Sequence, residues 1–163
     1  EFRRVLFRST VRNNIFAFGN SAQIQASRNE ARLRFRYMNN IVVWDSASPL
    51  LDGGEWNWKF FDKIDRGDPK DSLVFRNNLY WPTDGKIPAK LTKSHFSWDE
   101  WRKMGRDNGS QFANPLFEDL AKRDFRLKAG SPAEKLGFKP WALTLAGVRQ
   151  ADVVGHHHPG SRV

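Results

Sequence analysis

The chain has 163 residues, of which 39% are hydrophobic and 13% aromatic, with seven Trp and thirteen Phe. This composition excludes a disordered chain and suits one domain with a hydrophobic core. The formal charge of +9 favours an anionic partner, the lack of cysteine excludes disulfides and thiolate metal sites, and no apolar run is long enough to span a bilayer.

The first nine residues, EFRRVLFRS, look like the in-frame translation of a sequencing-adapter oligonucleotide. We therefore expect the domain to begin at residue 10, and the chain to be a metagenomic fragment whose signal peptide and first coils lie in a missing N-terminal part. The alternative is a genuine basic arm. A fragment of this kind would expose a sheet edge at its first coil, which predicts aggregation of the isolated piece.

A phrase with two adjacent asparagines occurs three times, as VRNNIF (11–16), YMNNIV (37–42) and FRNNLY (75–80). The second asparagine recurs after 26 and then 38 residues. A phrase repeated at such intervals is typical of a solenoid. Asparagine tolerates the left-handed backbone that a corner needs, and stacked amides can form hydrogen bonds from one turn to the next. We predict that Asn14, Asn40 and Asn78 lie stacked.

Short strands are predicted on either side of these corners, at 15–18, 23–25, 31–37, 41–44 and 75–81. Residues 31–37 alternate strictly, so their apolar side chains should face the interior and their arginines should form an outward column. The arginines of this column are Arg32, Arg34 and Arg36. Pro82 should end the last of these strands.

Residues 45–71 form an excursion between the second and third phrases. A sharp turn is predicted at 50–54, a strand at 56–61, and a charged loop at 62–69. Trp56 and Trp58 are two residues apart and should share one face of their strand. Loops held by a rigid scaffold often carry function.

The C-terminal part is predicted to close the last coil. An S-x-x-E capping box at Ser97 begins a helix that should stop at Gly105, and a second box at Ser131 begins a helix that should stop at Gly137. Residues 124–128 should form one more strand. We expect these short capping helices at the C-terminal end to cover the last coil, and residues 150–163 to form a loose tail.

Several phrases, in this order, are similar to the C-terminal part of bacterial right-handed parallel β-helix proteins of the pectate-lyase-like superfamily. They are the Asn-Asn phrases, Asn78–Trp81, Phe96–Trp101, Gly105–Ser110, Asn114–Phe117, Asp124–Lys128 and Gly130–Ala133. The resemblance covers most of residues 10–149. It implies an all-β solenoid that is exported, secreted or periplasmic, and often carbohydrate-active. Asn114 departs from the pattern, where Asp is more usual, which weakens any role for a carboxylate there.

Each candidate binding residue has a plain structural alternative. The arginine column could bind uronate carboxylates through bidentate hydrogen bonds, or it could be a solvated strand face. Trp56 and Trp58 could stack on sugar rings or pack in the core. Asp62 and Asp65, with other loop carboxylates, could supply the acid and base of a glycosidase, or could simply be solvated.

No cofactor or metal site is expected. The adjacent histidines His156–His158 lack the spacing of ligands around one ion, and His95 is expected to be structural or exposed. Asp107 and Ser110 follow a helix end with no histidine nearby, so a turn or cap role is favoured over a catalytic one.

These observations predict a fragment of a carbohydrate-active protein, a polysaccharide lyase or glycoside hydrolase whose active site lies partly or wholly upstream. The partner would be a polysaccharide, acidic if the arginines bind it, and the full-length protein would be a monomer. The alternative is a non-catalytic binding or structural module. Nucleic-acid binding is suggested by charge alone and is not expected.

Overall fold

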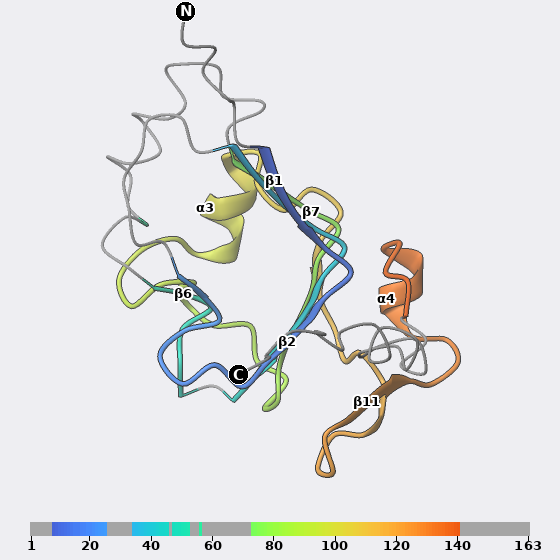
Figure 1. The fold of residues 1–163 in the computed structure, drawn as a ribbon. Helices are drawn as coiled ribbons and strands as arrows, with labels where there is room; N and C mark the ends of the chain where they lie inside the picture. Colours follow the sequence, from blue (N-terminus) through green and yellow to red (C-terminus); the bar gives the residue numbers. More distant parts are fainter. Residues whose placement is uncertain (1–7, 26–33, 46, 53–55, 57–72, 141–163) are drawn as a thin grey trace, which may run out of the picture.

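The computed structural model describes residues 8–25, 34–45, 47–52, 56 and 73–140 (Figure 1). Their regular secondary structure is mostly β-strand, together with the two short helices α3 and α4, so the predicted all-β class is confirmed. Neither of these described helices is long and apolar enough to cross a membrane.

Three sheets are parallel, and each takes its strands from successive parts of the chain. The first contains β1 (Arg8–Arg12), β4 (Arg34–Met38) and β7 (Leu73–Arg76). The second contains β2 (Ile15–Ala17), β5 (Ile41–Trp44), β8 (Leu79–Pro82) and β9 (Gln111–Phe112). The third contains β3 (Ile24–Gln25) and β6 (Leu51–Asp52).

Each copy of the Asn-Asn phrase joins a strand of the first sheet to a strand of the second. The copies are aligned, because Val11 pairs with Tyr37 and Tyr37 with Phe75 in the first sheet. In the second sheet Ile15 pairs with Ile41, and Ile41 with Leu79.

Two of the differences from the predicted elements are explained by strand pairing. Strand β1 begins at Arg8, before the expected domain start at residue 10, because Arg8 and Ser9 pair with β4. Leu51 and Asp52 form β6 instead of a sharp turn, since they pair with β3 and Leu51 is buried.

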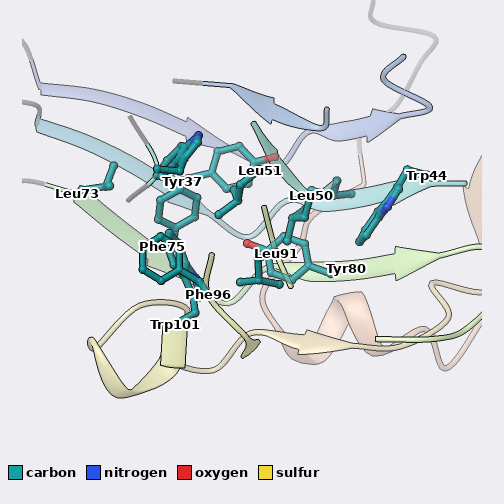
Figure 2. Packing of buried hydrophobic residues seen from close by; sticks show 12 residues of the cluster. Tyr37, Trp44, Leu50, Leu51, Leu73, Phe75, Tyr80, Leu91, Phe96 and Trp101 are labelled. Atoms are coloured by element: carbon teal, nitrogen blue, oxygen red, sulfur yellow. The ribbon is translucent and has the colours of Figure 1, made fainter. Parts of the chain in front are cut away.

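The main core is lined by side chains from all three parallel sheets, and its buried members are mostly aromatic or leucine. Figure 2 shows Tyr37, Phe75 and Trp101 one beside the next within it. Trp101 comes from helix α3 (Trp98–Lys103), which begins at the predicted capping box of Ser97 and Glu100 and is followed by Gly105 at φ 76°. The helix thus adds a large side chain to this core.

A second core lies on the other face of the second sheet. All four residues of β5 are buried, with Val42 and Trp44 in the main core and Ile41 and Val43 in the second. A strand buried on both faces is expected to be continuously apolar, as this one is. The second sheet is therefore covered on both sides.

The cover on the outer side is formed by residues 117–138, which the prediction placed over the last coil together with the helix at Ser97. Strands β10 (Phe117–Asp119) and β11 (Asp124–Leu127) form an antiparallel hairpin, and helix α4 (Pro132–Lys135) follows. In Figure 1 β11 and α4 lie outside the sheets, whereas α3 lies within them. The physical reason is that outward-facing apolar residues such as Ile41 and Leu79 need a cover of their own.

Candidate functional site

The second asparagines of the three phrases form a hydrogen-bonded file, the Asn ladder of Asn14, Asn40 and Asn78. The backbone N and Nδ2 of Asn14 donate to Oδ1 of Asn40 at 3.1 and 3.3 Å. Asn40 repeats both bonds to Oδ1 of Asn78 at 3.1 and 3.3 Å. The predicted stacking of these residues is confirmed.

The first asparagine of each phrase makes the corner. Asn13, Asn39 and Asn77 have φ values of 55°, 54° and 53°. These values lie in the left-handed region, which asparagine enters more readily than most residues. The two asparagines thus have separate tasks, one setting the bend and the other linking the strands that follow it.

The ladder continues into a fourth turn that was not predicted from the sequence. Ser110 takes the ladder position, and its Oγ accepts a hydrogen bond from the backbone N of Asn78 at 2.8 Å. Gly109 takes the corner position at φ 76°, where a Cβ would clash with Oδ1 of Asn77. The signal in the sequence was the order Asn108-Gly109-Ser110 just before β9.

A buried carboxylate accepts the hydrogen bond from the last asparagine of the ladder, Asn78. Asp107 is 1% exposed and accepts hydrogen bonds from Asn78 Nδ2 at 3.1 Å and Ser110 Oγ at 2.5 Å. The Tyr80 hydroxyl and Trp101 Nε1 donate to it at 2.9 and 2.7 Å. Burial raises the pKa of Asp107 against the opposing effect of these donors. Its place agrees with the predicted structural role, because a carboxylate so enclosed cannot contact an external substrate.

The same cluster keeps Tyr80 protonated. Burial, and then the charge of nearby Asp107, raise the pKa of the Tyr80 hydroxyl well above its ordinary value. The hydroxyl therefore remains a hydrogen-bond donor to the carboxylate. The ladder, Tyr80 and Asp107 together hold the first and second sheets in a fixed relation.

The outer face of the first sheet carries arginines at successive strands. On β7, Leu73 and Phe75 are buried whereas Arg76 is exposed, and on β4 Tyr37 is buried whereas Arg36 is only half-buried. Arg12 on β1 is exposed as well. We call Arg12, Arg36 and Arg76 the basic face.

The register brings these three residues close together. Arg12 lies opposite Met38, which lies opposite Arg76, while Arg36 is two residues earlier on the middle strand. Neighbouring strands are about 4.8 Å apart, so the backbone positions of Arg12 and Arg76 are separated by about 10 Å. No residue of β1, β4 or β7 is acidic, so these strands supply no neutralising charge.

The structure describes two of the three arginines in the predicted column. Arg36 belongs to the basic face, Arg34 lies in β4 opposite Arg8, and Arg32 lies outside the described residues. Arg12 and Arg76 were missed in the prediction. The sequence feature that could have identified them is the spacer, the residue directly before each asparagine pair. This residue is Arg, Met and Arg in the three phrases.

The tryptophan and carboxylate candidates do not join this face. Trp56 is 4% exposed, and its ring centroid lies 6.1 Å from that of Phe75 and 5.9 Å from that of Trp101. It is a core residue, so the sugar-stacking interpretation is wrong for Trp56, whose flat faces are covered. Trp58, Asp62 and Asp65 lie outside the described residues.

No group of three or more potential metal ligands occurs in the part of the chain that the structure describes. His95 is half-buried, and its backbone N and O bond with the Thr92 hydroxyl at 2.7 and 3.0 Å. The expected structural role of His95 fits these bonds. His156–His158 lie outside the described residues.

A pocket of about 430 Å³ lies elsewhere, between the second sheet and its C-terminal cover. Its apolar lining comes from Ile15, the β11 hairpin strand and Phe138. Arg126 at its rim is paired with Asp124, and this hydrogen-bonded pair lowers the pKa of Asp124 to about 2. None of the lining residues belongs to the basic face, so the two are separate features.

No protein-family model matches the chain, and no curated protein or solved structure is significantly similar to it.

Proposed function

We propose that this chain is the C-terminal part of a right-handed parallel β-helix protein of the pectate-lyase-like type, and that its basic face binds an acidic polysaccharide. The architecture is supported by the aligned parallel strands and by the Asn ladder that links them. The observation that carries the binding proposal is the placement of Arg12, Arg36 and Arg76 on one outward face of acid-free strands.

Guanidinium groups suit such a ligand because their planar fork matches a carboxylate with two parallel hydrogen bonds. A polymer of uronic acid repeats one carboxylate per sugar, and several weak contacts along one chain add up through their high effective concentration. Arginines on three successive strands can each engage a different sugar of the same polymer. A single small anion would gain much less from this arrangement.

The activity we propose is that of a polysaccharide lyase or glycoside hydrolase of an exported protein, with catalytic groups outside the described residues. A non-catalytic binding module is the second candidate. It is favoured by the state of two described carboxylates, since Asp107 is enclosed in the core and Asp124 is paired with Arg126.

Binding is tested by affinity electrophoresis of the protein in gels that contain polygalacturonate or neutral dextran. The test variant combines Arg12→Gln, Arg36→Gln and Arg76→Gln. The matched control combines Lys122→Gln, Lys128→Gln and Lys135→Gln, which removes the same charge from the hairpin and α4. We expect retardation by polygalacturonate alone, kept in the control and lost in the test variant. Equal loss in both variants would show that net charge, and not the basic face, holds the polymer.

Turnover separates the two candidates. A lyase produces unsaturated sugar ends and a hydrolase produces new reducing ends, so both products are measured after incubation with the polymer that binds. Binding without either product, in a protein that carries the complete upstream coils, would favour the non-catalytic module.

A further inference from the structure

The chain contains one asparagine that is directly followed by glycine, Asn108 in the turn before β9. This turn is closed by a hydrogen bond from the backbone N of Ser110 to Asp107 O at 2.9 Å. Its two central residues, Asn108 and Gly109, are exposed. Gly109 has φ 76°, and a Cβ there would clash with Oδ1 of Asn77. The fold therefore requires glycine at this corner, directly after an exposed asparagine.

An asparagine followed by glycine is prone to deamidation. The backbone nitrogen of the glycine attacks Cγ of the asparagine, a C–N bond forms, and the side-chain nitrogen leaves as ammonia. Water then opens the five-membered succinimide at either carbonyl and gives aspartate or isoaspartate. In sum, water is consumed, ammonia is released and an amide becomes a carboxylate, with no oxidant or reductant. Glycine favours the attack because it has no Cβ to obstruct the approach.

The attacking nitrogen at this turn is not held by the fold. No described residue accepts a hydrogen bond from the backbone N of Gly109. The residue after each corner asparagine is different, because its backbone N donates to the next member of the Asn ladder at 3.1, 3.1 and 2.8 Å. Attack by one of those nitrogens would break a ladder bond. The corner asparagines are therefore protected, and these are Asn13, Asn39 and Asn77.

Position 108 extends a row that contains two arginines of the basic face. Arg12 lies opposite Met38, Met38 lies opposite Arg76, and Arg76 forms a parallel bridge with Asn108. Residues paired across neighbouring strands lie on the same face of a sheet, about 4.8 Å apart. Arg76 and Asn108 are both exposed. Deamidation of Asn108 thus adds a negative charge directly beside Arg76.

We propose that Asn108 is a spontaneous deamidation site of the folded chain, and that the carboxylate it forms pairs with Arg76 and weakens the basic face. The new carboxylate competes with those of a bound polymer for the same guanidinium group. Binding of an acidic polysaccharide therefore declines as the protein ages. This effect on binding rests on the proposed function, whereas the chemical step does not.

The chemical step is tested on the intact 163-residue chain, kept folded at pH 7 and at pH 9 and digested with trypsin at intervals. Mass spectrometry of the peptide 107–122 measures the conversion of Asn108. We expect Asn108 to convert about tenfold faster than the corner asparagines, because only its attacking nitrogen is free and belongs to glycine. The rate should rise with pH, since that nitrogen must lose its proton. Asn108→Gln should remove the reaction, because the longer side chain closes only to a six-membered ring.

Two outcomes would overturn this step. One is conversion of Asn108 at the same rate as the corner asparagines. The other is conversion that occurs in a chain unfolded by urea but not in the folded chain, which would mean that the turn holds the reacting atoms apart.

The effect on the basic face is tested with Asn108→Asp in gels that contain polygalacturonate. The matched control is Asn20→Asp, which adds the same charge at an exposed position beyond β2. We expect about threefold weaker binding for Asn108→Asp than for the control, the order of effect of one exposed charge pair. Aged wild type should lose affinity in the same way, and aged Asn108→Gln should not.

Equal affinities of the two charge variants would overturn the effect on binding. If the unmodified chain does not bind the polymer at all, the proposed function fails and this effect fails with it. The mass measurement still decides whether Asn108 deamidates, so the two failures can be told apart.

Discussion

Asparagine is used twice in each phrase because its short amide serves two different needs. At Asn13, Asn39 and Asn77 it accepts the left-handed backbone of the corner, and at the ladder positions it links one strand to the next. An amide is suited to the ladder because it donates and accepts at once, so each residue can both receive from one neighbour and give to another. A carboxylate or an aliphatic side chain cannot do both.

The middle of the ladder should therefore matter more than its end. Asn40 is buried and bonded on both sides, so Asn40→Leu should lower the free energy of unfolding by about 1–3 kcal/mol. Asn14 is exposed, and Asn14→Leu should cost less than about 1 kcal/mol. Denaturant unfolding of both variants measures this. Equal costs at the two positions would argue against a ladder that stabilises the fold mainly through its buried members.

Asp107 should make stability depend on pH. Burial raises its folded pKa above the unfolded value, so its contribution is greatest below about pH 4 and is lost as the pH rises through the raised pKa. At pH 4, Asp107→Asn should destabilise by about 1–3 kcal/mol because an amide NH₂ would meet the donor Nε1 of Trp101.

The difference between wild type and Asp107→Asn should then shrink from pH 4 to pH 7. Unfolding curves of both proteins across this range provide the measurement, and the subtraction removes the effect of the other acidic groups. A difference that grows with pH would mean that the donors around Asp107 outweigh burial and lower its pKa.

Among the strands and helices, the second sheet is the centre of the packing. Its strands contribute to the main core on one face and to the second core on the other, where the hairpin of β10 and β11 and helix α4 cover it. The helix is anchored by Ser131, whose Oγ donates to Pro115 O at 2.7 Å and accepts from Ala133 N at 3.3 Å. Ser131 thus ties the start of α4 to the segment that leads into β10.

Removing one large side chain should loosen this cover selectively. Phe138 is 5% exposed in the second core, so Phe138→Ala should cost about 3 kcal/mol. Hydrogen exchange should speed up in β11 and α4 more than in β4 and β7. The control is Ser97→Ala, which removes the N-cap of α3 at a cost of about 1 kcal/mol. It perturbs a helix that packs in the main core and not in the second core. Uniform acceleration in both variants would mean that the two cores unfold as one unit.

The elements also differ in how far they could be predicted from the sequence. The corners, the strands beside them and the helix starts at Ser97 and Ser131 depend on local chemistry, and these predictions are confirmed. The position of the C-terminal cover could not be predicted, because it depends on which face of the second sheet remains apolar after the strands pair. The sugar-stacking interpretation of Trp56 failed for the same reason, since alternation does not say whether a face is covered.

The candidate site was predictable only in part. The strict alternation around Arg36 identified its strand face, but Arg12 and Arg76 join that face only through the register of three separate strands. Register between distant segments depends on the full set of pairings, and a single phrase does not reveal it. The residue before each asparagine pair could be identified in the sequence, but only the strand register shows that Arg12 and Arg76 share a face.

In the molecule as a whole, we propose that the two larger parallel sheets have different roles, one in packing and the other in binding. The second sheet uses both faces for packing, whereas the first sheet leaves its outer face to arginines on β1, β4 and β7. The net charge of +9 would attract polyanions to any part of the surface, while the basic face sets guanidinium groups in register. Specific binding should therefore depend on position and not on charge count.

The sharpest test of the basic face is an NMR titration of the arginine Nε–H signals with an oligogalacturonate. We expect the signals of Arg12, Arg36 and Arg76 to shift together and saturate at one ligand concentration, while those of Arg123 and Arg126 on the hairpin stay unchanged. Unchanged signals from the three strand arginines, or equal shifts from the hairpin arginines, would contradict the proposed binding face.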